Sequence, residues 1–153
     1  MRRRNSSKLP ILIVVVAVIL FVIFFIRVLS GVGEQDPKDI VEAFYHYEQE
    51  GDFGSAWEHF HPVMQERFSK NAYVTERSHI YMSHYGVETF SFELGDEEEV
   101  KNWKMAKDAE KFSNAYRVEV EQTFKSKFGT FRVIQDIYVV KDEEEWKVVW
   151  AFD

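Results

Sequence analysis

The chain has 153 residues, no cysteine, and 26 acidic against 19 basic residues, which gives a formal net charge of −7 at pH 7. Without cysteine the chain has neither disulfides nor a lipid anchor attached through a thiol. Only 14 of the basic residues follow residue 29, whereas all 26 acidic residues do. An acidic excess of this size repels nucleic acid and anionic surfaces at long range, so we expect no nucleic-acid partner.

An apolar segment spans residues 9–29 and contains a single charged residue, Arg27. About 20 residues of helix cross the hydrocarbon core of a bilayer, so this segment predicts a transmembrane helix. The basic tail of residues 1–8 contains no acidic residue, which places it in the cytoplasm and the remaining chain outside the cell membrane. A cleaved signal peptide that ends near Ser30 is the alternative, but the apolar segment is long for one.

Residues 30–35 form a short polar linker, and the remaining residues, 36–153, have the length of one ordinary domain. Asp36 and Pro37 indicate the start of a helix, which Gly51 ends. Apolar residues recur at helical spacing in three further segments, which we predict as helices over residues 53–60, 62–70 and 75–85.

After Gly86 the apolar pattern changes to alternation, which is typical of strands. We predict strands over residues 87–94, 100–105, 116–125, 131–140 and 146–152. The acidic runs 96–99 and 142–145 are interpreted as solvated turns, and Gly129 marks a further turn. Helices followed by a meander of antiparallel strands predict an α+β fold, in which helices pack on a curved sheet.

Three stretches of the sequence resemble a known superfamily. Residues 39–70 resemble the helical opening of nuclear-transport-factor-2-like domains, which are cone-shaped α+β domains. Residues 74–92 and 136–153 resemble a branch of it, the domain that precedes the transpeptidase in class B penicillin-binding proteins of the methicillin-resistance type. The residues that match the ending of that domain are Trp146, Lys147, Val148 and Trp150. The resemblance implies the cone-like fold, an outward orientation and a setting in the cell envelope.

The chain departs from these proteins where their chemistry would lie. It contains neither a Ser-x-x-Lys box nor a Lys-Thr-Gly sequence, so the resemblance does not carry penicillin binding over to it. In that family the matching domain has no catalytic residues and serves as a spacer or an interaction platform. The resemblance therefore implies a non-catalytic domain.

Polar residues in the predicted cone are the candidates for a pocket. Small-molecule isomerases and hydrolases of this superfamily hold an acid or base inside an apolar cavity. Gln122 and Gln135 occupy inward strand positions, where they either line a pocket or hydrogen-bond to each other in a closed core. We expect the closed core, and with it no catalytic residue and no cofactor. The candidate pocket residues are Tyr45, His46, His84, Gln122, Gln135 and Asp136.

Two histidines, His59 and His61, lie two residues apart at the end of a predicted helix. Residues at this spacing do not share a helical face, and the sequence offers no third ligand, so we expect no metal site. The acidic runs lack the pattern of a calcium-binding loop. Trp146 and Trp150 lie on the same face of the last predicted strand, and we expect both in the core.

Together these expectations describe a single-pass membrane protein whose outer domain binds a protein of the bacterial envelope or acts as a spacer. An assembly component of a secretion or conjugation channel is an alternative of the same class. A small-ligand binder or enzyme that uses the cone cavity is the alternative from another class.

Overall fold

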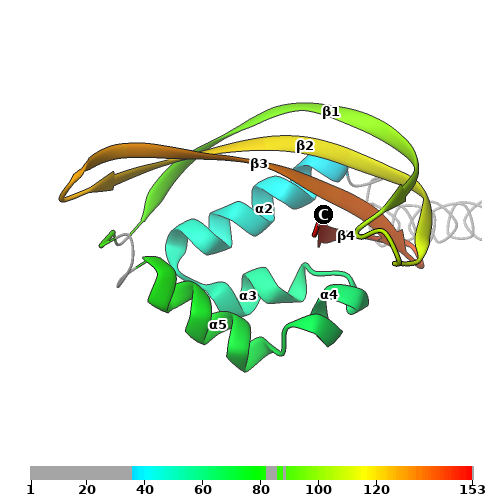
Figure 1. Cartoon of the computed structure of the whole chain (residues 1–153), viewed down its shortest axis with the longest axis horizontal. Coiled ribbons are helices and arrows are strands. Elements are labelled where there is room, and N and C mark those ends of the chain that lie inside the picture. The colour runs from blue at the N-terminus through cyan, green and yellow to red at the C-terminus, as the bar shows by residue number, and fades with distance from the viewer. Residues whose placement is uncertain (1–35, 82–85, 88, 153) are drawn as a thin grey trace, which may run out of the picture. The chain divides into compact units, whose positions relative to one another are not determined.

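The computed structural model describes residues 36–81, 86, 87 and 89–152, all within one compact unit (Figure 1). The helices come first and are α2 (Pro37–Glu50), α3 (Phe53–Glu58), α4 (Pro62–Arg67) and α5 (Lys70–His79). The strands follow and are β1 (Phe90–Lys104), β2 (Lys111–Ser126), β3 (Gly129–Asp142) and β4 (Glu145–Trp150). They form one antiparallel sheet in the order β1-β2-β3-β4, so the predicted α+β meander is confirmed.

The described part of the chain holds no helix that is long and apolar enough to cross a membrane. Its longest helix, α2, has 14 residues and carries polar residues throughout, whereas a spanning helix needs about 20 apolar ones. The predicted fold class with a transmembrane helix, the single-pass topology and the cell-membrane location are corrected accordingly. Residues 9–29, on which these predictions rested, lie outside the described residues.

Helix α2 begins and ends where the sequence signals place it. The Asp36 side chain accepts a hydrogen bond of 2.9 Å from the Lys38 amide, and Pro37 occupies the first helical position. Gly51 ends the helix with a φ of 77°, a conformation that residues with a side chain rarely adopt. The face of α2 that is buried includes Ile40, Val41, Phe44 and Tyr45.

The boundary between α4 and α5 differs from the expected one. The apolar pattern predicts one helix over residues 62–70 and another from Thr75, but α4 ends earlier and α5 begins before residue 75. Ser69 is the reason, because its hydroxyl accepts a hydrogen bond of 3.3 Å from the Ala72 amide and so caps α5. The cap extends α5 toward the N-terminus and makes Tyr73 part of the helix.

Strand β1 continues through the acidic run 96–99, which the sequence pattern predicts as a turn. The register shifts between Leu94 and Glu97, so a bulge absorbs the irregularity without ending the strand. Glu98 lies opposite Arg117 of β2, whose Nη2 donates a hydrogen bond of 2.6 Å to its carboxylate. The predicted turn is wrong because the neighbouring strand supplies a cation that offsets part of the repulsion within the run.

The last part of β1 and the first part of β2 curl around the end of the sheet that carries β4 (Figure 1). The Trp103 ring of β1 stacks on the Tyr138 ring of β3, with centroids 4.1 Å apart. Val149 points away from the helices, because it alternates with the inward Trp150, yet it is fully buried. The curled ends therefore cover a second, smaller core on the outer face of β3 and β4.

The opposite half of β3 pairs with a described strand on one side only. β4 pairs with β3 only from Ile137 to Asp142. Among the described strands, residues 129–136 pair with β2 alone and run with it into a hairpin beyond β4 (Figure 1). We call residues 129–136 the open edge. Phe128 in the hairpin turn exposes 86% of its surface, and Ile134 within the open edge exposes 61%.

Candidate functional site

Aromatic side chains fill the space between the helices and the sheet. The Phe44 ring of α2 lies 5.2 Å from Phe60, measured between centroids, and Phe60 lies 4.9 Å from Trp150 of β4. Toward the other end of the sheet, Phe90 and Phe124 of neighbouring strands lie 5.3 Å apart. All of these rings except Trp150 are buried. The space between the helices and the sheet is therefore a packed core at these positions.

Glu48 is the charged group at the centre of this core, and its side chain is fully buried. Arg77 of α5 binds both carboxylate oxygens through Nε, at 2.9 and 3.1 Å, and one of them also through Nη2. The hydroxyl groups of Tyr73 and Tyr81 donate to the same carboxylate, the latter at 2.7 Å. The three donors are spaced four residues apart, so they lie on one face of the helical segment. The cluster ties α2 to that segment.

The electrostatics of this cluster keep its three donors, Tyr73, Arg77 and Tyr81, protonated. Burial raises the pKa of Tyr73 and Tyr81 above the usual value, and the negative charge of Glu48 raises it further, so both hydroxyls remain donors. Burial alone would lower the pKa of Arg77, but the adjacent Glu48 carboxylate raises it well above the usual value. Each Glu48 oxygen thus already accepts several hydrogen bonds. We interpret the cluster as a structural ion pair, because such a carboxylate lacks a free position for a substrate proton.

Tyr45 and His46, two of the predicted pocket residues, point in different directions from α2. The Tyr45 ring is buried against Phe92, 5.6 Å between centroids, and burial raises the pKa of its hydroxyl. The His46 side chain is 55% exposed and lies 3.7 Å from Glu42. His46 lines a groove of about 320 Å³ between α2 and β1, and Tyr45 is not among the residues that line it.

Gln122 and Gln135 are on one face of the sheet but are not directly opposite each other. The register pairs Gln122 with Val133 and Gln135 with Val120. Gln122 is buried beside the Tyr81 hydroxyl, although its Nε2 meets no partner of good geometry among the described residues. Gln135 is only half-buried. The structure therefore does not gather these two and the α2 residues around one cavity.

The remaining candidates lie elsewhere. Asp136 follows Gln135 and so points to the opposite, outer face, where Arg117 binds it at 3.2 Å. His84 lies outside the described residues. His59 Nδ1 lies 3.0 Å from the Ser55 carbonyl oxygen. His61 caps the N-terminus of α4. The described residues contain no group of three or more side chains that could hold a metal ion.

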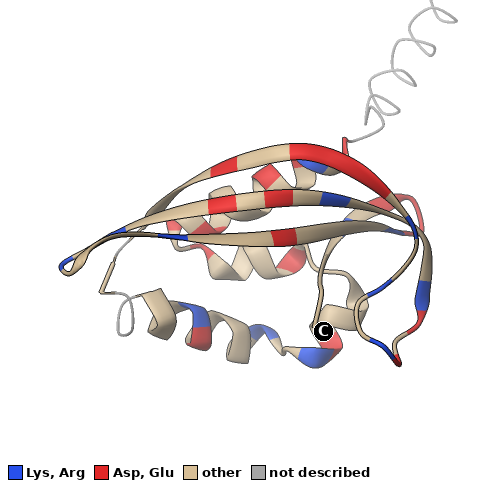
Figure 2. Cartoon of the chain, turned by 45° about the horizontal axis from the view of Figure 1, so that its top comes forward, with Lys and Arg blue, Asp and Glu red and all other residues tan. Residues whose placement is uncertain are grey.

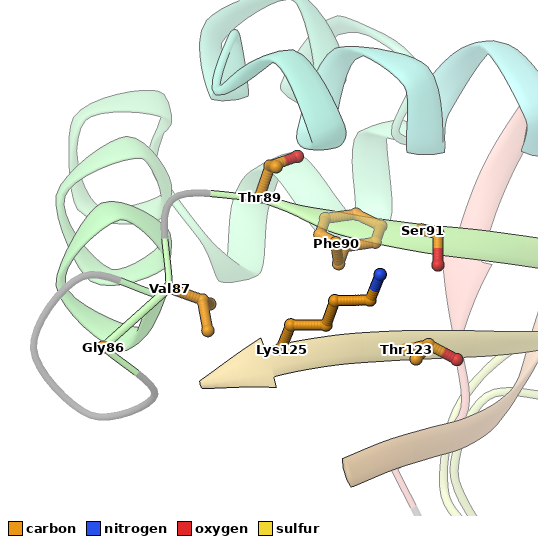
Figure 3. Close-up of a pocket in the computed structure, with 7 residues that line it drawn as sticks. All are labelled: Gly86, Val87, Thr89, Phe90, Ser91, Thr123 and Lys125. Atoms are coloured by element: carbon orange, nitrogen blue, oxygen red, sulfur yellow. The ribbon is translucent and has the colours of Figure 1, made fainter. Parts of the chain in front are cut away.

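A depression of about 550 Å³ lies between the start of β1 and the end of β2 (Figure 3). Figure 3 shows the Lys125 side chain extended along the strands toward Phe90 and Ser91. The Thr89 hydroxyl already donates to the Gln49 carbonyl at 2.7 Å. The described lining contains hydroxyl groups and one ammonium but neither a carboxylate nor an imidazole, so it offers no acid–base pair. The lining residues are Gly86, Val87, Thr89, Phe90, Ser91, Thr123 and Lys125.

A smaller cavity, of about 190 Å³, lies where β4 ends. Its walls are mainly apolar and include Phe68 and Ile80 together with the Trp150 ring. Sites for small molecules are usually at least about 300 Å³, so this cavity suits a single side chain better than a cofactor. The full lining is Phe68, Ala72, Tyr73, Glu76, Arg77, Ile80 and Trp150.

Acidic residues predominate in the middle of the sheet, where Arg117 lies among them, and basic residues occur toward its ends (Figure 2). Acidic residues face each other across the outer face, where Glu93 lies opposite Glu121 and Glu119 lies opposite Asp136. The β2–β3 hairpin is basic in contrast, because residues 122–135 include three cations and no acidic residue. These cations are Lys125, Lys127 and Arg132.

The buried cluster around Glu48 was not predicted from the sequence, although a signal for it exists. Glu48 continues the apolar stripe of α2 four residues after Phe44, which is an unusual place for an unpaired charge. Tyr73, Arg77 and Tyr81 repeat at the same four-residue interval. A buried acid on one helix and a stripe of donors on another together point to a shared ion pair.

Comparison with models of known protein families and with curated proteins finds no match for this sequence.

Proposed function

We propose that residues 36–152 form a non-catalytic protein-interaction domain of the nuclear-transport-factor-2-like type. The exposed apolar side chains of the β2–β3 hairpin are the observation that carries the proposal. Phe128 and Ile134 expose 86% and 61% of their surface, whereas many other aromatic and aliphatic residues of the domain are buried in its core. Aromatic residues and arginine are enriched at protein–protein interfaces, and Phe128 at the hairpin tip is open to such a contact.

The interior of the domain supports the same proposal. Glu48 is its most deeply buried charged group, and the donors around it occupy both carboxylate oxygens. The 550 Å³ depression contains no acid–base pair among its described residues. The resemblance to a penicillin-binding-protein domain without catalytic residues agrees with this reading. We therefore assign partner binding to the hairpin surface and not to the space between the helices and the sheet.

Site-specific photo-cross-linking tests the proposal. Phe128 is replaced by p-benzoylphenylalanine in the full chain, within the cells that produce it, so that one aromatic group replaces another. We expect irradiation to yield one discrete adduct with another protein. The control places the same group at Asn71, an exposed position on α5, where no such adduct is expected. The proposal is wrong if both positions give the same adducts or if neither gives one.

A further inference from the structure

The outer face of the β2–β3 hairpin bears an uncovered apolar side chain. Ile134 lies on this face, as Asp136 does, because one residue separates the two along β3. Among the described residues, the exposed large apolar side chains are Ile134 and Phe128, which lies in the turn of the same hairpin. Both therefore belong to one surface of one element pair.

Carboxylates surround Ile134 on the outer face. Glu121 of β2 lies directly opposite Ile134, and Glu93 of β1 lies opposite Glu121. At the next outward position along the strands, Glu119 lies opposite Asp136. Like charges that face each other across strands are destabilising, so this arrangement costs stability in the isolated chain.

The cations of the face neutralise only part of this charge. Arg132 binds Glu121 at 3.0 Å, and Arg117 is shared between two other carboxylates. Of the described residues, none forms an ion pair with Glu93 or Glu119, and both of these side chains are exposed. A negative charge therefore remains beside Ile134, where a cation of another molecule is able to reach it.

The turn of the same hairpin has the complementary chemistry. Lys127 directly precedes Phe128, and its Nζ lies 4.9 Å from the centre of the Phe128 ring. Lys125 follows the buried Phe124, so it lies on the outer face, and both lysines are exposed. Neither lysine forms an ion pair within the described part of the chain. Figure 2 shows this basic turn apart from the acidic middle of the sheet.

Two copies of the chain satisfy both surfaces at once. When their outer faces meet with the strands antiparallel, a symmetry axis between the sheets exchanges the two ends of the hairpin. The turn of each copy then lies over Ile134 and its carboxylates in the other copy. Phe128 and Ile134 are about 20 Å apart along the hairpin at the usual rise, so the axis passes midway between them. Sheets that pack face to face are about 10 Å apart, a gap that lysine and glutamate side chains bridge.

Other occupants lack this match. With the strands parallel, the basic turns of the two copies coincide, and their lysines repel. Pairing the open edges would place the turn of each copy at the end of β4 in the other, where Trp150 already pairs with Ile137. Nucleic acid and anionic surfaces are repelled by the carboxylates around Ile134. The antiparallel pair is thus the arrangement that covers the apolar side chains and opposes unlike charges.

We infer that the outer face of the β2–β3 hairpin binds a second copy of the chain, with the two hairpins antiparallel. The inference rests on the proposed function, because it names the partner that the hairpin binds. The paired surface is about 25 Å long and two strands wide at the usual spacings, which is small for an interface. We therefore expect a weak dimer that salt weakens further.

Photo-cross-linking in cells tests the inference on the full chain. Two copies with different affinity tags are produced together, and p-benzoylphenylalanine replaces Phe128 in one of them. We expect an adduct that carries both tags. With both copies changed, Lys125→Glu/Lys127→Glu should lower its yield by at least about fivefold, and so should Glu93→Lys/Glu119→Lys.

A mixture of these two variants is the decisive arm. An acidic turn then meets a basic face in one half of the dimer, and an unchanged turn meets an unchanged face in the other half. The yield of the doubly tagged adduct should therefore return to within about twofold of the original. Lysine at positions 93 and 119 faces carboxylates of the neighbouring strands, so it relieves repulsion and keeps the fold.

The matched control changes the net charge by the same amount outside the hairpin. Lys101→Glu/Lys107→Glu replaces two exposed lysines and should alter the yield by less than about twofold. Mixed with Glu93→Lys/Glu119→Lys, it should give no recovery. An equal loss in this control, or no recovery in the decisive mixture, would overturn the inference. An adduct with a different protein would also overturn it while the proposed function stands, and the absence of any adduct would refute both.

Discussion

At the residue scale, the pair formed by Glu48 and Arg77 is the most demanding arrangement in the domain. A carboxylate loses its hydration when it is buried, and only a complete set of donors compensates for that loss. Arg77, Tyr73 and Tyr81 supply the set from a single helical face. The pair therefore specifies how α2 and α5 meet more than it adds net stability.

Removing one partner of this pair should be costly. We expect Arg77→Met to lower the free energy of unfolding by about 3–5 kcal/mol, because Glu48 is then left buried without a cation. Urea unfolding monitored by circular dichroism measures the change. The double variant Glu48→Leu/Arg77→Met is the control and should lose less than Arg77→Met alone. A larger loss in the double variant would contradict a coupled pair.

His61 gives the stability a dependence on pH. Its Nδ1 accepts a hydrogen bond from the Val63 amide, and burial lowers its pKa below the usual value although Asp142 and Glu110 oppose the shift. The unfolded chain therefore binds this proton more readily, so stability falls as pH drops below about 6.5. The urea midpoint should decrease between pH 7.5 and 5.5. In His61→Asn, which keeps a capping side chain, the decrease should be smaller, and an equal decrease would contradict this account.

At the scale of elements, local signals account for much of the fold. The cap at Asp36 and the glycine at position 51 delimit α2, and alternation identifies β3 and β4 near their true bounds, whereas β2 begins at Lys111, before the predicted start at residue 116. One element, β1, depended on its surroundings instead. β1 passes through the acidic run because Arg117 lies opposite Glu98, and no local pattern reveals that register. Cross-strand partners of this kind are set by tertiary structure.

Glycine substitutions test the helix boundary after α2. Gly51 has a φ of 77°, so Gly51→Ala should destabilise the domain by about 1–2 kcal/mol. Gly54 lies inside α3, where an added Cβ would be 3.5 Å from its nearest neighbours, an ordinary contact. Gly54→Ala is thus the matched control and should be neutral or slightly stabilising. Thermal unfolding of the two variants compares them, and equal effects would contradict the role of Gly51.

At the scale of the whole molecule, charge is divided unevenly, because acidic residues predominate in the middle of the sheet and basic residues at the hairpin tip. The sequence reveals the net charge and the absence of a catalytic motif, but not this division, because it depends on which residues the register places side by side. For the same reason Tyr45, His46, Gln122 and Gln135 could be named as polar candidates, while their dispersal over separate surroundings could not. The Glu48 cluster was detectable in principle from helical spacing.

The acidic face carries a stability cost that a single substitution should reveal. Glu93 lies directly opposite Glu121, and like charges in that position repel. We expect Glu93→Gln to stabilise the domain by about 0.2–1 kcal/mol in urea unfolding at low salt, with a smaller gain at high salt. Glu98→Gln is the control, because it removes the ion pair with Arg117 and should not stabilise. A gain in the control alone would contradict this explanation.

The position of Trp150 has a consequence for biosynthesis. Its indole meets Phe44, Phe60, Phe68 and Tyr73, so it closes the aromatic cluster on which the helices rest. Every one of those rings leaves the ribosome before Trp150 does. During synthesis the apolar faces of the helices therefore stay uncovered until β4 has emerged from the ribosome. We expect chaperones that bind exposed apolar surface to associate with this domain during that interval.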